Sequence, residues 1–221
     1  MDNVLKFINN LNINENDTVV VSCSYGPDSM YMLYIMHTYY KCKVVCAHVN
    51  HKMRQASEQE FIDLKSYCDK NSIIFEGTEI LNYEECDNFH EYARNFRYEY
   101  FESVVKKYHA KYLFTAHHGD DLMETILMRI VRGSTLGGYA GFRKISCHGD
   151  YSIVRPLVYM TKDELRTKID GFIEEETADE KSKNTIRKYK HVATLFVNSL
   201  PDGEIQKSDI VGVKDKLLHD Y

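Results

Sequence analysis

The stretch Thr18–Ser29, TVVVSCSYGPDS, decides the fold expected for this chain. Its first six residues are β-branched, small or apolar, which is typical of a short strand buried on both faces. The next six contain a glycine and a proline and indicate a turn, and residues 29–39 have the composition of a buried helix. The sequence therefore predicts a strand, a turn and a helix in immediate succession.

The same alternation continues along the chain. We expect further strands at 43–49, 73–76, 111–116 and 152–155, and further helices at 1–11, 57–70, 87–108 and 120–132. Thr161–Glu164 has the spacing of a capping box ahead of one more helix. Strands that alternate with helices predict an α/β fold with a doubly wound, mainly parallel sheet and helices on both faces.

Composition limits the class of protein. A chain of 221 residues suggests one compact domain with a short appendage, and a net charge of −5 argues against a protein that simply coats nucleic acid. The N-terminus lacks the features of a signal peptide, and no apolar run is long enough to span a bilayer. The six cysteines form no CxxC pair and are interpreted as reduced thiols, so we expect a cytoplasmic protein.

The turn after the first strand has the chemistry of a phosphate site. Unpaired N–H groups at a helix N-terminus bind phosphate, and Ser24 and Ser29 add hydroxyl donors. Gly26 permits close approach to a ligand, and Pro27 suits a first helical turn. Asp28 beside phosphates is explained by a bound Mg²⁺. An ordinary strand–helix turn with a serine cap is the alternative, and the GxxxxGK[ST] pattern of a P-loop is absent.

A second cluster, His117–Thr125, directly follows the expected fourth strand. In a doubly wound sheet this is the carboxyl edge, where ligands bind. Asp121 and Glu124 share a helical face, and such carboxylates coordinate Mg²⁺ at a leaving pyrophosphate. A helix cap with surface ion pairs is the simpler interpretation, and a zinc site at the paired histidines lacks further ligands.

Two more segments fit a ligand site at the same edge. His48–His51 ends the expected second strand, and the helix at 87–108 carries Arg94 and Arg97 three residues apart. Arginines at this spacing either grip phosphate or an RNA backbone, or form a solvated stripe.

In order and spacing, these segments resemble the tRNA(Ile)-lysidine synthetase family of PP-loop enzymes. The family motifs SGGxDS, HVNH, ARxxRY, AHHxDDxxET, RGxxLxGLxGF and RPL are matched at Ser24–Ser29, His48–His51, Ala93–Tyr98, Ala116–Thr125, Arg132–Phe142 and Arg155–Leu157. The likeness runs from about residue 18 to 196. It implies an ATP-dependent carbon–nitrogen ligase that adenylates C2 of the wobble cytidine in CAU-anticodon tRNA(Ile). Lysine then displaces AMP, pyrophosphate having already left.

The resemblance also implies roles for individual residues. Asp28 and Asp121 would hold Mg²⁺ and act in catalysis with Arg94 and Arg97. Residues implied to bind ATP are Ser24, Tyr25, Gly26, Pro27, Asp28, Ser29, His48, Asn50, His117 and Gly133. Residues implied to bind the tRNA or lysine are Asp120, Glu124, Arg129, Arg132, Lys183, Asn184 and Arg187.

The sequence departs from the family pattern at several places. Tyr25 replaces the first glycine of SGGxDS, and Glu175 and Ala178 replace the aspartate and asparagine of EDxSN. We interpret residues 1–170 as the PP-loop catalytic domain and 171–221 as a helical extension without the family's C-terminal tRNA-binding domains. A homodimer, or reliance on the basic residues between Lys181 and Lys190, would then have to supply tRNA affinity.

Three other functions stay open at this point. A 2-thiocytidine synthetase would need CxxC motifs, and a PP-loop amide synthetase for GMP or NAD would lack the RGxxLxG block. A catalytically weakened paralogue that only binds nucleotide or tRNA is the third.

Overall fold

The computed structural model of the chain describes residues 2–53, 56–80, 88–131 and 141–177, and residues 1–170 form one compact unit. The description below concerns that unit. Five predicted site residues lie outside the described residues: Arg132, Gly133, Lys183, Asn184 and Arg187. The helical extension expected over residues 171–221 also lies outside them beyond residue 177.

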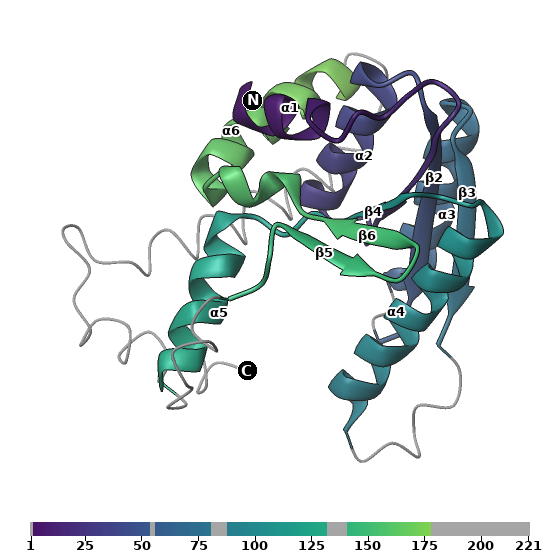
Figure 1. The fold of residues 1–221 in the computed structure, drawn as a ribbon. Coiled ribbons are helices and arrows are strands. Elements are labelled where there is room, and N and C mark those ends of the chain that lie inside the picture. Colours follow the sequence, from purple (N-terminus) through teal and green to yellow (C-terminus); the bar gives the residue numbers. More distant parts are fainter. Residues whose placement is uncertain (1, 54–55, 81–87, 132–140, 178–221) are drawn as a thin grey trace. The chain divides into compact units, whose positions relative to one another are not determined.

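A six-stranded sheet forms the centre of the unit (Figure 1). Its strands are β1 (Thr18–Ser22), β2 (Lys43–Asn50), β3 (Ile74–Glu79), β4 (Tyr112–Phe114), β5 (Ile145–His148) and β6 (Tyr151–Val154). The strand order is β3-β2-β1-β4-β6-β5, and every neighbouring pair is parallel except β5–β6. The predicted α/β fold with a mainly parallel sheet is therefore confirmed.

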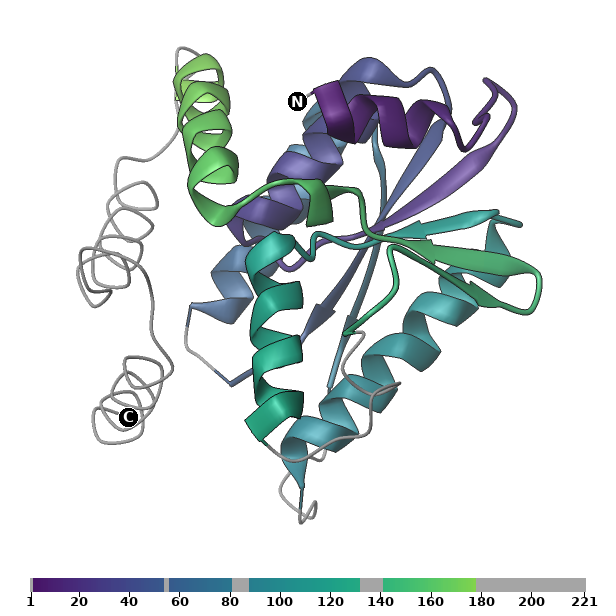
Figure 2. The ribbon, with the colours of Figure 1, turned by 60° about the vertical axis from the view of Figure 1, so that its left-hand side comes forward.

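Helices cover both faces of this sheet (Figures 1 and 2). They are α1 (Asp2–Asn9), α2 (Pro27–Tyr39), α3 (Ser57–Lys70), α4 (Phe89–Lys107), α5 (Gly119–Val131), the 3₁₀ turn η3 (Pro156–Tyr159) and α6 (Lys162–Thr177). Phe101 and Val104 of α4 pack in one core cluster with Val20 of β1 and Ala47 of β2. None of the helices in the described part of the chain is long and apolar enough to cross a membrane.

The hairpin of β5 and β6 was not predicted in full. The expected strand at 152–155 corresponds to β6, whereas β5 was not expected, and three of its four residues are exposed. An exposed edge strand carries no run of buried apolar residues, which is the signal that predicts a strand. The hairpin turn includes Gly149 at φ +58°, a left-handed conformation that glycine adopts without strain.

The predicted capping box is present at the start of α6. The Thr161 N–H donates to Glu164 Oε2 at 2.9 Å, and the Glu164 N–H donates to Thr161 Oγ1 at 3.2 Å. These reciprocal bonds fix where the helix begins.

Candidate functional site

A pocket opens at the carboxyl edge of the sheet, where β1, β2 and β4 end beside one another. Its polar walls come from two loops: Ser24, Gly26, Asp28 and Ser29 after β1, and Thr115, His117 and Asp121 after β4. Tyr25 and Pro27 do not line it, and Val49, Tyr98 and Phe101 supply an apolar wall. A concave site with one apolar wall and two convergent polar loops is the usual form of a small-molecule site. The two polar loops singled out in the sequence therefore face the same cavity.

Ser29 organises the turn after β1. Its hydroxyl donates to the Gly26 carbonyl oxygen at 2.8 Å and accepts from the Ser24 N–H at 3.1 Å. No side chain caps the N-terminus of α2, which begins at Pro27. The N–H groups of its first turn are therefore available for an anion, as the sequence suggested.

Tyr25 occupies the turn in a left-handed conformation, with φ of 63°. A side chain at this φ costs roughly 1–2 kcal/mol, and glycine avoids that cost. A glycine here, as in the SGGxDS motif, would adopt this φ without that cost, which Tyr25 bears in this chain.

Asp28 and Asp121 both approach Nε2 of His118. The distance from His118 Nε2 is 3.8 Å to Asp28 Oδ2 and 3.6 Å to Asp121 Oδ2. Burial raises the pKa of Asp28; His118 and Lys162 oppose this rise, and the charge of Asp121 adds to it. Two carboxylates that converge in a pocket, one of them with a raised pKa, are a donor set that fits a hard cation such as Mg²⁺.

Asp121 also has a structural role at the start of α5. Its Oδ2 accepts from the His118 N–H at 2.8 Å, which caps the helix and fixes the direction of the carboxylate. The two neighbouring acids are not part of the pocket lining. The Asp120 carboxylate accepts from the Lys162 N–H at the start of α6, and Glu124 is exposed on α5.

His117 lies in the pocket next to the apolar side chain of Phe142, at 5.3 Å between ring centroids. Its Nδ1 is 2.8 Å from Thr115 Oγ1. Burial, assisted by the charge of Arg155, lowers the pKa of His117 to about 4, so the ring is neutral at physiological pH. Sequence reasoning missed Thr115; the signal available was its place directly after β4.

His48 and Asn50 of β2 do not line the pocket. His48 Nδ1 is 2.7 Å from the Cys23 carbonyl oxygen, and Asn50 Oδ1 accepts from the Lys52 N–H at 2.9 Å. Alternation along a strand turns these two residues away from the face on which Val49 packs. Val49 and His51 reach the pocket instead. His48 contacts the backbone of Cys23, which lines the pocket, whereas Asn50 bonds to the backbone of Lys52.

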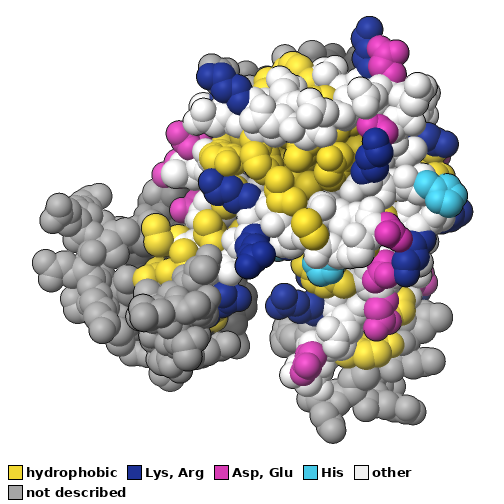
Figure 3. Space-filling model, viewed as in Figure 1, with side chains coloured by type: hydrophobic (Ala, Val, Ile, Leu, Met, Phe, Trp, Pro, Cys, Tyr) yellow, Lys and Arg dark blue, Asp and Glu magenta, His cyan; other side chains and the backbone are white. Residues whose placement is uncertain are grey.

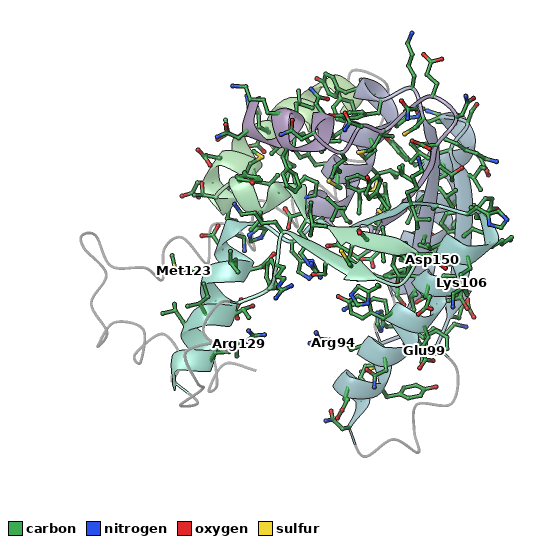
Figure 4. All side chains as sticks on the ribbon, in the orientation of Figure 1. Arg94, Glu99, Lys106, Met123, Arg129 and Asp150 are labelled. Atoms are coloured by element: carbon green, nitrogen blue, oxygen red, sulfur yellow. The ribbon has the colours of Figure 1, made fainter. Side chains whose placement is uncertain are left out.

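The predicted arginines that the structure describes, Arg94, Arg97 and Arg129, take different positions. Arg97 lines the pocket, whereas Arg94, one turn earlier on α4, does not. Arg94 and Arg129 point from α4 and α5 into the space between the two helices (Figure 4). Arg129 donates to the Gly141 carbonyl oxygen at 2.9 Å. Figure 3 shows lysine and arginine side chains on both sides of the hollow between α4 and α5, with acidic side chains further along one of them.

A parallel sheet whose strand ends carry a phosphate turn and converging carboxylates defines an ATP-binding α/β domain. The profile of the PP-loop domain family matches residues 1–189, and the chain belongs to that family. It is similar to tRNA(Ile)-lysidine synthase of Bacillus subtilis (strain 168), with 36% identity over 173 residues, 75% of this chain and 37% of the relative. The enzyme of the same name from Enterococcus faecalis (strain ATCC 700802 / V583) is 38% identical over 68% of this chain and 33% of the relative. The chain thus spans about a third of the length of these relatives.

Solved structures share the fold at low sequence identity. The U34-tRNA thiolase NcsA of Methanococcus maripaludis superposes with a TM-score of 0.60 at 18% identity, covering 72% of this chain and 57% of that one. The NH3-dependent NAD synthetase of Campylobacter jejuni superposes with a TM-score of 0.55 at 13% identity, covering 99% of this chain and 91% of that one. At such identities the likeness concerns the fold alone.

Proposed function

We propose that this chain carries the catalytic domain of a tRNA(Ile)-lysidine synthase. The main support is the convergence of Asp28 and Asp121 on His118, in the pocket that the phosphate turn also lines. Relatives of that name align over 68–75% of the chain and support the same assignment.

In this proposal ATP enters with its phosphates at the turn from Ser24 to Ser29. The α2 N–H groups bind phosphate oxygens, and the wall of Val49, Tyr98 and Phe101 accommodates the base. Asp28 and Asp121 would hold Mg²⁺, which neutralises charge on the departing pyrophosphate. The Asp121 carboxylate is already oriented by its bond to the His118 N–H, so little rearrangement is needed.

The second substrate would be the wobble cytidine of CAU-anticodon tRNA(Ile). Arg97 lines the pocket and would stabilise negative charge near the reacting phosphate, and Arg94 and Arg129 would contact the tRNA backbone. The C2 oxygen attacks the α-phosphate and pyrophosphate leaves. The amine of lysine then adds to C2, loses a proton and expels AMP.

A sulfur-transferring PP-loop enzyme is the second candidate, because a tRNA thiolase shares the fold. That thiolase is described with a [4Fe-4S] cluster. Across the described ranges of this chain, no three His, Cys, Asp or Glu side chains are grouped to hold a metal ion. The identity of the co-substrate, lysine or a sulfur donor, therefore separates the two candidates.

The test is incubation of the protein with ATP, Mg²⁺, lysine and a tRNA(Ile) transcript. We expect AMP release that depends on both lysine and tRNA, and a modified cytidine whose mass equals cytidine plus lysine minus water. Asp28→Ala should abolish both signals. Asp69→Ala, which removes an exposed carboxylate on α3, is the matched control and should retain activity.

Two other results would refute the proposal. ATP and tRNA binding without AMP release would identify a paralogue that has lost catalysis. Turnover that requires a sulfur donor in place of lysine would identify a thiolase.

A further inference from the structure

The hydroxyl of Thr115 has one partner within the described residues, and that partner is the ring of His117. Thr115 is 4% exposed, and its N–H donates to the Val154 carbonyl oxygen at 3.0 Å, so its backbone is fixed against β6. Its Oγ1 lies 2.8 Å from His117 Nδ1. A buried hydroxyl whose hydrogen finds no acceptor costs free energy. We therefore expect the Thr115 hydroxyl to donate its hydrogen to His117 Nδ1.

Among the described residues, one assignment of protons gives a hydrogen-bond partner both to the Thr115 hydroxyl hydrogen and to His117 Nδ1. If Nδ1 carried the ring proton, Thr115 Oγ1 would accept it and the hydroxyl hydrogen would lack an acceptor among the described residues. If the hydroxyl donates to Nδ1, the ring proton of neutral His117 must reside on Nε2. The low pKa of His117 agrees with a neutral ring.

We propose that Thr115 is a positioning residue that holds His117 as the Nε2–H tautomer, so that the ring offers a neutral donor to an anionic oxygen of ATP. This inference rests on the proposed function. His117 lines the pocket, and within the described residues Nε2 has no hydrogen-bond partner. Contact with Phe142 holds the ring plane in place. Arg155, which lies over Phe142 at 5.4 Å, adds positive charge on that side.

A neutral donor is suited to this location. A protonated imidazole would be attracted to the carboxylate of Asp121 and would compete with the cation proposed there. The Nε2–H tautomer donates to a phosphate oxygen without adding that competing charge. The opposite tautomer would present a lone pair to the same oxygen and repel it.

The experiment is nitrogen NMR of the full chain labelled with ¹⁵N-histidine. The chain has ten histidines, and the His117 signals are identified by their loss in His117→Gln. We expect the Nε2–H pattern in the wild type and in Thr115→Ser, and a shift toward Nδ1–H in Thr115→Val. The dissociation constant for ATP should rise about tenfold in Thr115→Val and stay near the wild-type value in Thr115→Ser.

The control variant is Thr167→Val, which removes a hydroxyl that donates to the Asp163 carbonyl oxygen on exposed α6. It should alter neither the tautomer nor ATP affinity. An Nδ1–H pattern in the wild type, or unchanged ATP affinity in Thr115→Val, would overturn the proposal. If the wild type binds no ATP at all, the proposed function and the donor role both fail, while the spectrum separately reports whether Thr115 sets the tautomer.

Discussion

The backbone N–H of Gly119 donates to the carbonyl oxygen of Met160 at 2.9 Å, which brings the first residue of α5 against the chain that leads into α6. A Cβ atom at Gly119 would lie 2.8 Å from the same oxygen. Real Cβ atoms do not approach a backbone oxygen this closely, so only glycine fits. The contact sets the position of α5 and therefore of Asp121.

Gly119→Ala should force the start of α5 away from Met160. We expect a loss of roughly 1–3 kcal/mol in stability and weaker ATP binding, because overpacking shifts the backbone that carries Asp121. Gly149→Ala is the control: its Cβ meets nothing within 4 Å, so it carries only the left-handed backbone cost of about 1–2 kcal/mol. Thermal melts and ATP titrations measure both effects. Equal ATP affinities in the two variants would contradict the positioning role.

Arg97 and Arg94 should differ in what they contribute. Arg97→Met removes a charged donor from the pocket and should lower kcat/KM about 10- to 100-fold. Arg94→Met should mainly raise KM for tRNA and reduce the salt dependence of binding. Steady-state kinetics at two salt concentrations separate the two effects, and identical profiles would show that the distinction is wrong.

Asp28→Asn should stabilise the ligand-free protein while abolishing turnover. The folded-state pKa of Asp28 is raised, so the folded protein favours the protonated form, and its stability falls as pH rises through the unfolded and then the folded pKa. At neutral pH the ionised carboxylate therefore costs stability, and the amide removes that cost. We expect Tm to rise by about 1–3 °C without Mg²⁺. A lower Tm in the variant would contradict the assignment of a functional, destabilising charge.

His117→Gln should flatten the acid limb of the stability profile. The folded pKa of about 4 lies below the ordinary value of 6.5, so stability is fully present above pH 6.5 and is lost as pH falls toward 4. Because the ring is partly exposed, we expect the wild type to lose only about 1–2 kcal/mol more than the variant across this window. Urea unfolding at pH 7 and pH 4.5 measures the difference. Parallel profiles would place the pKa near its ordinary value.

Tyr25→Gly and Tyr25→Ala form a matched pair. Both remove the side chain, but only glycine removes the strain of φ 63°. Glycine also increases the freedom of the unfolded chain, so the net gain should be small. We expect Tyr25→Gly to be more stable than Tyr25→Ala by about 1 kcal/mol in chemical denaturation. The reverse order would mean that this turn is not left-handed in solution.

The fold was predictable because its signals are local. The β-branched run of β1 and the immediate start of α2 define one strand–turn–helix unit, and the later strands repeat that pattern. The edge strand β5 was missed because an exposed strand of four residues has no buried face to mark it. Helix ends were close to the expected bounds wherever a cap or a proline marks them, as at Pro27 and Thr161.

The site was predictable at the level of loops but less so at the level of side chains. The rule that parallel strands end at one edge placed the Ser24–Ser29 turn and the His117–Thr125 cluster together, and residues of both line the pocket, His117 and Asp121 from the second. Residues along a strand alternate between the two faces of the sheet, so His48 and Val49 point to opposite faces. The motif does not specify which of these faces the pocket and α4 occupy. The bond between the Asp120 carboxylate and the Lys162 N–H joins residues 42 positions apart, and such a contact is set by tertiary structure, which no local pattern predicts.

That bond of Asp120 joins the first turns of two helices through a single carboxylate. Asp120 directly precedes Asp121 in the chain. A displacement of the start of α6 would therefore move the residue next to the carboxylate that is proposed to hold the cation.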